Sequence, residues 1–320
     1  MFEDAPNPIR VQPAPQQKRE NSPTPLVLIH DGSGTTFSYF ILGDLQREVW
    51  AIHNPYHDRS MPLEGGINEM ARHYIDLMQA AGISGRIFLG GWSFGGYVSL
   101  AMARILAGDI SSSITVAGLL IIDSAYYEPL PETKAVNSSE MTGSKNSTSL
   151  PEGLPEETKK SFEACGLLLD NWELPKWDGP SLGGKGVQVS IAGSSSLLER
   201  GTSLHKPVAG SWATIDTATY HQPGSTPQSI SPPPAVAIRC TRPTPGSQDQ
   251  YDNERLLGWE GRYPDFIKAV IDVDAEHYTL FDHVDEAKMS SLTAQLNEAM
   301  EMLESIRPYP SEDTMDMGHS

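Results

Sequence analysis

The feature that most constrains this chain is the pattern Gly-x-Ser-x-Gly, formed by Gly91, Ser93 and Gly95. In this pattern a strand ends, the chain turns sharply at the serine, and a helix begins, so that the hydroxyl group stands clear of the sheet. The flanking sequence fits: the largely apolar run 86–89 favours a strand, and 97–106 is rich in helix formers and free of Gly and Pro. Ser93 is therefore a candidate nucleophile.

The rest of the chain alternates strand-like runs with helix-like segments. The strand-like runs are apolar throughout, which is typical of parallel strands that are buried on both faces. Two further segments have helical character: 67–78, which carries an apolar stripe, and 284–303. The pattern predicts an α/β fold with a mostly parallel sheet covered by helices on both faces. The expected strands outside the serine motif are 26–29, 49–52, 116–122, 235–239 and 265–273.

Three parts of the chain flank or interrupt this alternation. Residues 1–24 are polar and proline-rich, which predicts a flexible N-terminal segment, and 306–320 predicts an acidic flexible tail. Residues from about 124 to 234 contain Ser/Thr/Asn-rich and Pro/Gly-rich stretches around a helix-like segment at 157–171. Such a length is unusual for a simple loop in a compact domain. We interpret it as an inserted lid, partly helical and partly irregular, within one domain that spans 25–305.

Charge and cysteine content exclude several classes of protein. A net charge of −18 without a basic stripe argues against a nucleic-acid partner and against an anionic membrane surface. No apolar signal core and no stretch of membrane-spanning length is present, so no membrane insertion is expected. Cys165 and Cys240 form neither a disulfide framework nor a metal-binding spacing. These features predict a cytoplasmic protein without a bound metal, and the glycosylation motifs at Asn137 and Asn146 carry little weight.

A serine nucleophile needs a histidine base and an acid that orients the histidine. In the hydrolase order of Ser, Asp and His, each group lies in a loop that follows a strand. His277 fits best because it follows the last expected strand, whereas His283 begins the last helix and is expected to face solvent or to cap it. The acid is either Asp123, which directly ends a strand, or Asp249 or Asp252 after the next strand. Position along the chain favours Asp123.

The negative charge that develops on the substrate needs backbone N–H donors. One donor is expected from Phe94, the residue after the nucleophile, and the other from the glycine-rich loop 31–34 after the first strand. The helix that begins after Ser93 directs the positive end of its dipole to the same place. His30 adjoins the loop and is expected either to shape it or to be an ordinary buried histidine.

Four segments together resemble the thioesterases that release chains from polyketide and nonribosomal peptide synthases, and the likeness is closest to the fungal members. The resemblance covers roughly residues 25–305 and is vague across the lid. The first loop departs from the commonest pattern, because Asp31 follows His30 where the usual start is of the His-Pro type. The segments that carry the resemblance are 30–34, 91–96, 121–124 and 275–280, and the lid stretch 172–179 is similar as well.

The resemblance implies an α/β-hydrolase fold with a helical lid over an acyl channel. It implies a substrate held as a thioester on the phosphopantetheine arm of an acyl or peptidyl carrier domain, and no cofactor bound to the enzyme itself. Catalysis would use Ser93, Asp123 and His277, with an acyl-enzyme on the serine that is resolved by hydrolysis or cyclisation. The expected oxyanion-hole residues are Phe94, Gly32 and Ser33, and the expected lid and channel residues are Trp92, Phe162, Trp172 and Trp177.

Two other functions stay open at this point: a small-molecule carboxylesterase or lipase with no carrier partner, and a hydrolase-fold binding protein that has lost catalysis. The complete set of Ser, Asp and His counts against the binding protein. Carrier domains of this family are usually acidic, so an enzyme of net charge −18 needs a local docking patch. The expected candidates lie in the lid and are Lys159, Lys160, Trp172, Leu174 and Trp177.

Overall fold

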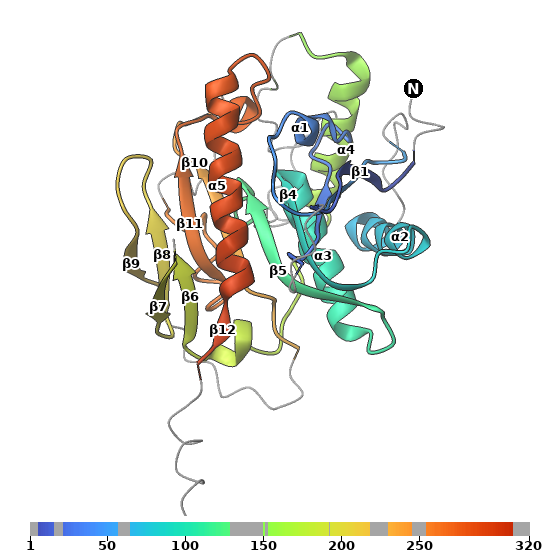
Figure 1. The fold of residues 1–320 in the computed structure, drawn as a ribbon. Coiled ribbons are helices and arrows are strands. Elements are labelled where there is room, and N and C mark those ends of the chain that lie inside the picture. Colours follow the sequence, from blue (N-terminus) through green and yellow to red (C-terminus); the bar gives the residue numbers. More distant parts are fainter. Residues whose placement is uncertain are drawn as a thin grey trace, which may run out of the picture.

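The protein is built around a nine-stranded sheet (Figure 1). The computed structural model describes residues 6–15, 22–56, 65–128, 150, 153–191, 193–217, 230–244 and 254–309. The inner strands are parallel, and the two outer strands run antiparallel to their neighbours. This arrangement confirms the predicted α/β fold with its mostly parallel sheet. In spatial order the strands are β1 (Ile9–Gln12), β3 (Val49–Ile52), β2 (Leu26–Ile29), β4 (Gly85–Trp92), β5 (Ile114–Ile122), β10 (Ala235–Cys240), β11 (Ile267–Val273), β8 (Thr202–Lys206) and β9 (Ala213–Asp216).

Helices cover both faces of this sheet, and two apolar cores result. One core contains buried side chains of α2 (Gly66–Ala80), α3 (Phe94–Gly108) and α4 (Glu156–Asp170). The other contains side chains of the short α1 (Phe37–Phe40) and the long α5 (Glu286–Ser305), which crosses the front of the sheet in Figure 1. Because each inner strand has a core on both sides, its residues can be apolar without alternation.

Local sequence explains the positions of these elements. All four residues of β2 are buried, as expected for a central parallel strand. The apolar stripe predicted on α2 is confirmed, since its six members are buried on one face of the helix. At the start of α5 the side chain of Asp285 accepts a hydrogen bond of 2.9 Å from the N–H of Lys288, which satisfies one of the free donors of the first turn.

The inserted segment differs from the lid that the sequence predicts. Its described part contains α4, close to the predicted helix, but β8 joins the main sheet beside β11 and β9 follows as the edge strand. A second, antiparallel sheet forms from β6 (Val187–Ile191), β7 (Ser194–Leu198) and β12 (Arg307–Pro308), after the short helix η2 (Ser181–Gly184). Part of the expected lid is therefore structural sheet. β7 and β8 have five residues each, contain Ser or Thr and are partly exposed, so no continuous apolar run marks them in the sequence.

A short strand lies within each of the two end segments that were expected to be flexible, and residues 1–5, 16–21 and 310–320 of these segments lie outside the described residues. β1 pairs with β3, and the side chain of Gln12 donates to the carbonyl of Gly43 and accepts from the N–H of Leu45. At the other end, β12 pairs with β6. Both strands are short, with four residues in β1 and two in β12, and they stand in polar, proline-containing sequence, which explains why composition alone suggested flexible tails.

Candidate active site

Ser93 lies in the sharp turn between β4 and α3. Its backbone has φ 55° and ψ −120°, a left-handed conformation that is strained for a residue with a side chain. The turn is held by two hydrogen bonds: the Ser93 N–H donates to the carbonyl of Ile122 at 2.9 Å, and the hydroxyl of Ser124 donates to the Ser93 carbonyl at 2.6 Å. A Cβ atom at Gly95 would lie 2.4 Å from the carbonyl oxygen of Ile29, so only glycine fits there.

The three predicted catalytic side chains meet at the carboxyl ends of the strands. The Nε2 atom of His277 lies 2.9 Å from Oγ of Ser93, and its Nδ1 atom lies 2.7 Å from Oδ2 of Asp123. His277 begins the short helix η3 (His277–Thr279) after β11, and its N–H donates to Oγ1 of Thr244 at 3.1 Å. Asp123 directly follows β5 with φ 49°, and the N–H of Cys240 donates to its Oδ1 atom at 2.8 Å. The structure thus brings together the candidate nucleophile, the candidate base and the candidate orienting acid.

The surroundings of Asp123 favour its charged form. Burial is the largest influence and acts to raise the pKa of this carboxyl group. The hydrogen bond and charge of His277, together with the N–H of Cys240, outweigh burial and hold the pKa of Asp123 below its ordinary value. An ionised carboxylate at this position can fix the histidine tautomer and stabilise the imidazolium that forms during catalysis.

Aromatic rings surround the catalytic histidine. Trp92 lies next to Ser93 in the chain, and its ring centre is 5.5 Å from that of His277 and 5.0 Å from that of Phe281. On another side, Tyr278 lies 5.0 Å from the His277 ring and 6.1 Å from the ring of Phe162 on α4. The structure therefore places two of the expected lid and channel residues, Trp92 and Phe162, near the site.

The two other expected channel residues, Trp172 and Trp177, lie elsewhere and are corrected here. Trp172 is buried, and its Nε1–H donates to Oδ1 of Asn68 on α2 at 3.2 Å. Trp177 packs against the same core, with the Arg104 guanidinium of α3 5.7 Å from its ring centre. These side chains fix the segment after α4 to α2 and α3. An indole side chain can serve a core as readily as a channel, and the sequence does not distinguish the two.

The loop that follows β2 forms a tight turn beside the nucleophile. Its carbonyl at Asp31 accepts a hydrogen bond from Gly34 N–H at 3.0 Å, and Gly34 has φ 78°. His30 is buried and supports the loop, because its Nδ1 atom lies 2.6 Å from the Asp31 carbonyl oxygen and its Nε2 atom lies 2.7 Å from the hydroxyl of Tyr74. This geometry fits the expectation that His30 shapes the loop.

The oxyanion-hole prediction needs one correction. Phe94 is the first residue of α3, so its N–H has no acceptor within the helix and is available beside Ser93. The N–H of Ser33, in contrast, donates to Oδ1 of Asp31 at 2.9 Å. Ser33 is therefore not an available donor to an oxyanion. Of the predicted pair, Gly32 is the residue whose N–H can still serve as that donor. A side chain that competes for a loop amide cannot be deduced from the loop's glycine content.

Several other predicted residues lie away from the catalytic centre or outside the described residues. Lys159 pairs with Glu156 at 2.7 Å on α4, and Lys160 is exposed. His283 is exposed just before α5. Among the described residues, no cluster of His, Cys, Asp or Glu could hold a metal ion. Outside the described residues lie the alternative acids Asp249 and Asp252 and the glycosylation motifs at Asn137 and Asn146.

Two residues that support the site were given no role in it from the sequence: Cys240 and Thr244. They act through a backbone N–H and a hydroxyl that hold Asp123 and His277. Cys240 is the last residue of β10, Thr244 lies shortly after it, and β10 lies between β5 and β11 in the sheet. A search of the residues that end the neighbouring strand would have found them, since the carboxyl ends of adjacent parallel strands lie at one edge.

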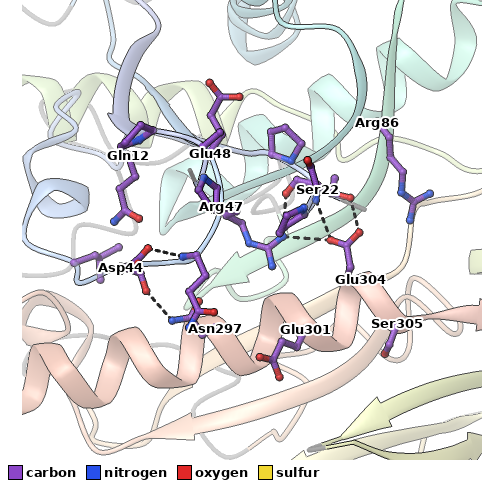
Figure 2. Close-up of a pocket in the computed structure, with 18 of the residues that line it drawn as sticks. Gln12, Ser22, Asp44, Arg47, Glu48, Arg86, Asn297, Glu301, Glu304 and Ser305 are labelled. Atoms are coloured by element: carbon purple, nitrogen blue, oxygen red, sulfur yellow. Dashed lines mark hydrogen bonds and ion pairs between the residues drawn. The ribbon is translucent and has the colours of Figure 1, made fainter. Parts of the chain in front are cut away.

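A separate cleft of about 1920 Å³ opens at the other edge of the sheet. It lies beside the residues that precede β2 and β3, beside Arg86 of β4, and along the C-terminal half of α5. Figure 2 shows Arg47 directed toward Glu304, and the two side chains form an ion pair of 3.3 Å. Arg47 also donates to the carbonyl of Thr24, whose hydroxyl donates to Glu304 at 2.7 Å. These contacts join β2, β3 and α5, and none of the described residues that line the cleft belongs to the catalytic set.

Comparison with known proteins gives a consistent result. The family model described as thioesterase domain matches residues 24–178. The chain is 40% identical over 320 residues to a probable thioesterase, KK1J, of Curvularia clavata. This match covers 96% of this chain and 99% of the relative. The chain is also 31% identical over 267 residues to the nonribosomal peptide synthetase imqB of Aspergillus flavus, covering 82% of this chain but 7% of the synthetase.

A solved structure shows the same fold. The NocB thioesterase domain from the Nocardicin cluster matches with a TM-score of 0.51 and 18% identity, covering 88% of this chain and 95% of that one. Together with the sheet order, this match confirms the α/β-hydrolase fold that the sequence resemblance implied. Among the described residues, no helix is both long enough and apolar enough to cross a membrane.

Proposed function

The chain belongs to the thioesterase family, and we propose that it releases an acyl chain, polyketide or peptidyl, from the phosphopantetheine arm of a carrier domain through an acyl-enzyme on Ser93. The observation that carries this proposal is the continuous series of hydrogen bonds from Oγ of Ser93 through His277 to Asp123. That series is the arrangement by which a serine becomes a nucleophile at neutral pH.

The first half of the reaction forms the acyl-enzyme. His277 accepts the Ser93 proton at Nε2 while Oγ attacks the thioester carbonyl carbon. The developing oxyanion is stabilised by the N–H of Phe94, by a second N–H from the loop after β2, and by the positive end of the α3 dipole. As the intermediate collapses, the carbon–sulfur bond breaks and His277 returns the proton to the leaving thiol. Asp123 stays ionised throughout and stabilises the imidazolium.

The second half resolves the acyl-enzyme. His277, now neutral, takes a proton from water or from a nucleophile within the acyl chain, and the tetrahedral intermediate forms in the same oxyanion hole. Its collapse frees Ser93 and gives an acid with water or a ring with an internal nucleophile. Which product dominates depends on how far the lid excludes water.

The proposed carrier partner is supported by the match to a segment of a nonribosomal peptide synthetase. A protein of that kind carries its intermediates as thioesters, and the matching segment amounts to 7% of its length. A chain that matches this segment over 82% of its own length can serve the same type of substrate, either within a synthase or beside one.

The decisive experiment follows the mass of an acyl-carrier protein during incubation with the enzyme. The wild-type protein should remove the acyl group and leave the holo-carrier, and the Ser93→Ala protein should not. A small thioester of the same acyl group, tested in parallel, separates carrier-dependent release from simple ester hydrolysis. Fast turnover of small esters with no preference for the carrier-bound form would instead identify a small-molecule carboxylesterase.

A further inference from the structure

The carboxyl group of Asp31 is buried in the turn after β2 and has no role in the reaction steps above. Asp31 is 6% exposed, and its Oδ1 atom accepts hydrogen bonds from both the N–H and the hydroxyl of Ser33. The Ser33 hydroxyl lies 3.0 Å from the hydroxyl of Thr35 and accepts the N–H of that residue at 3.2 Å. A short polar network therefore fixes the direction of each peptide group in the turn.

Two backbone N–H groups of this turn already have acceptors within it. The N–H of Gly34 is satisfied by the Asp31 carbonyl, and the N–H of Ser33 is satisfied by the Asp31 carboxyl group. These bonds leave the N–H of Gly32 as the donor in this turn that can serve an oxyanion.

We propose that Asp31 is a positioning residue of the oxyanion hole: by holding the Ser33 amide it directs the Gly32 N–H toward the carbonyl oxygen of a substrate on Ser93. This inference rests on the proposed acyl-enzyme at Ser93. In this role the essential property of Asp31 is a side-chain acceptor at the Oδ1 position. Its negative charge is not required, and a charge so close to a developing oxyanion would oppose the reaction.

Contacts on two other sides of the turn point to the same function. The Asp31 carbonyl oxygen is held by His30, which is itself anchored to Tyr74 on α2. On the outer side, the ring of Phe162 from α4 lies against Gly32 so closely that a Cβ atom there would be 2.5 Å from Phe162 Cδ1. The peptide group at Gly32 is thus fixed from the core and from the lid helix, and Asp31 completes the set by fixing the residue that follows it.

The test compares Asp31→Ala with Asp31→Asn on a small thioester, an N-acetylcysteamine ester, with each rate divided by the number of active sites that a fluorophosphonate titrates. Alanine removes the acceptor, and we expect kcat per active site to fall about a hundredfold with little change in KM, within the range for loss of one oxyanion donor. Asparagine keeps the Oδ1 acceptor without the charge, so we expect it to restore kcat to within about threefold of the wild-type value.

Two control variants separate the proposed role of Asp31 from two simpler effects. One effect is the loss of any turn held by an aspartate, and the other is the loss of the Ser33 hydroxyl group. Asp44 makes the same kind of bond, from its Oδ1 atom to the N–H of Gln46 at 2.7 Å, in an exposed turn that takes no part in the catalytic site. Asp44→Ala should leave kcat unchanged. Ser33→Ala removes the hydroxyl but keeps the amide that Asp31 holds, so its kcat should fall by less than about fivefold.

Either of two results would overturn the proposal: an Asp31→Ala enzyme with wild-type kcat per active site, or an Asp31→Asn enzyme as impaired as the alanine variant. A loss confined to the number of titrated sites would show a role in folding alone and would overturn it as well. Failure of the proposed function looks different, because a wild-type protein that fluorophosphonate does not label has no serine nucleophile. An enzyme that ignores carrier proteins still gives a readable result on the small thioester.

Discussion

The Nδ1 atom of His277 lies 2.7 Å from Oδ2 of Asp123, although 154 residues separate the two along the chain. Asp123 directly follows β5 and His277 follows β11, and the strand between them, β10, contributes the Cys240 N–H that holds the second carboxylate oxygen. The contact therefore depends on the order of three neighbouring parallel strands. A change that shifts the register of β10 would separate acid from base without altering either residue.

Asp123→Asn should reduce kcat by roughly ten-thousandfold, because an amide at this position favours the wrong histidine tautomer. Steady-state kinetics on a small thioester measures the effect, with the melting temperature as a control for folding. Asp249→Asn and Asp252→Asn serve as comparisons and should have small effects. If one of those two variants were the more impaired, the acid would have to be moved to the later loop.

Ser93→Ala should lose nearly all activity while remaining folded, since loss of a catalytic serine can cost on the order of a million-fold in kcat. The variant should also fail to react with a fluorophosphonate that labels the wild-type enzyme. Circular dichroism and thermal unfolding establish that the fold is intact. Substantial release activity in the pure variant would rule out Ser93 as the nucleophile.

Gly32→Ala should disturb the oxyanion loop through the lid helix. The added methyl group would lie 2.5 Å from Cδ1 of Phe162, and overpacking of this kind typically costs about 1–3 kcal/mol. We expect kcat to fall, and we expect the fall to be smaller when Gly32→Ala is made in a Phe162→Ala background. A double-mutant cycle on kcat/KM measures this coupling. Additive effects would mean that Phe162 does not confine the loop.

Asp31→Asn should stabilise the protein at neutral pH. Burial, the largest influence, raises the pKa of Asp31 above its ordinary value of 3.8, although the bonds from Ser33 and the charge of His277 oppose this rise. The folded state therefore binds a proton more readily than the unfolded state, and the charged carboxylate destabilises the fold above the raised pKa. That cost disappears as the pH falls below the ordinary value.

Urea unfolding of the wild-type and Asp31→Asn proteins between pH 3.5 and about 8 measures this effect. We expect the variant to be more stable at pH 7, with the difference closing toward acid. Asp76→Asn, at an exposed position of α2, is the control for replacing an aspartate by asparagine. Greater stability of the wild-type protein at neutral pH would contradict the prediction.

Replacing Lys159 and Lys160 with Glu should raise the apparent KM for an acyl-carrier protein. Lys159 bonds to Glu156 and Lys160 is exposed, so both lie on the outer side of α4, at the lid. Adding negative charge there weakens attraction to an acidic partner. Turnover of a small acyl-pantetheine should stay nearly constant, since Ser93 is untouched. An equal loss on both substrates would indicate damage to α4, and no loss on either would place carrier docking elsewhere.

The parts of the structure that the sequence predicts are those with a local signal. The turn at Ser93 depends on glycines two residues away, and the fully buried strands, such as β2, consist of uninterrupted apolar residues. The order of Ser, Asp and His along the chain was enough to propose a catalytic set, because strand ends in a parallel sheet meet at one edge. In each case the local environment of a residue determines its type, so the sequence itself carries the signal.

What the sequence did not predict depends on contacts between distant segments. β8 is short and polar, and it becomes part of the main sheet only because β11 offers a free edge. Trp172 is a residue type that can line a lid, but its indole N–H donates a hydrogen bond to Asn68 on α2. The amide of Ser33 is taken by the side chain of Asp31, and no pattern in the loop indicates which peptide group remains available.

Two of the three proposed catalytic residues, Ser93 and Asp123, have backbone φ angles of 55° and 49°. Non-glycine residues in such conformations cost on the order of 1 kcal/mol or more, and glycine would relieve the strain at either position. At Asp123 the hydrogen bonds with His277 and Cys240 offset this cost, because they favour the charged carboxylate in the folded state. At Ser93 the strain is not offset in that way, so a Ser93→Gly protein should melt at a higher temperature than the wild type although it lacks the hydroxyl group. Heat resistance and reactivity therefore make opposite demands on this one position.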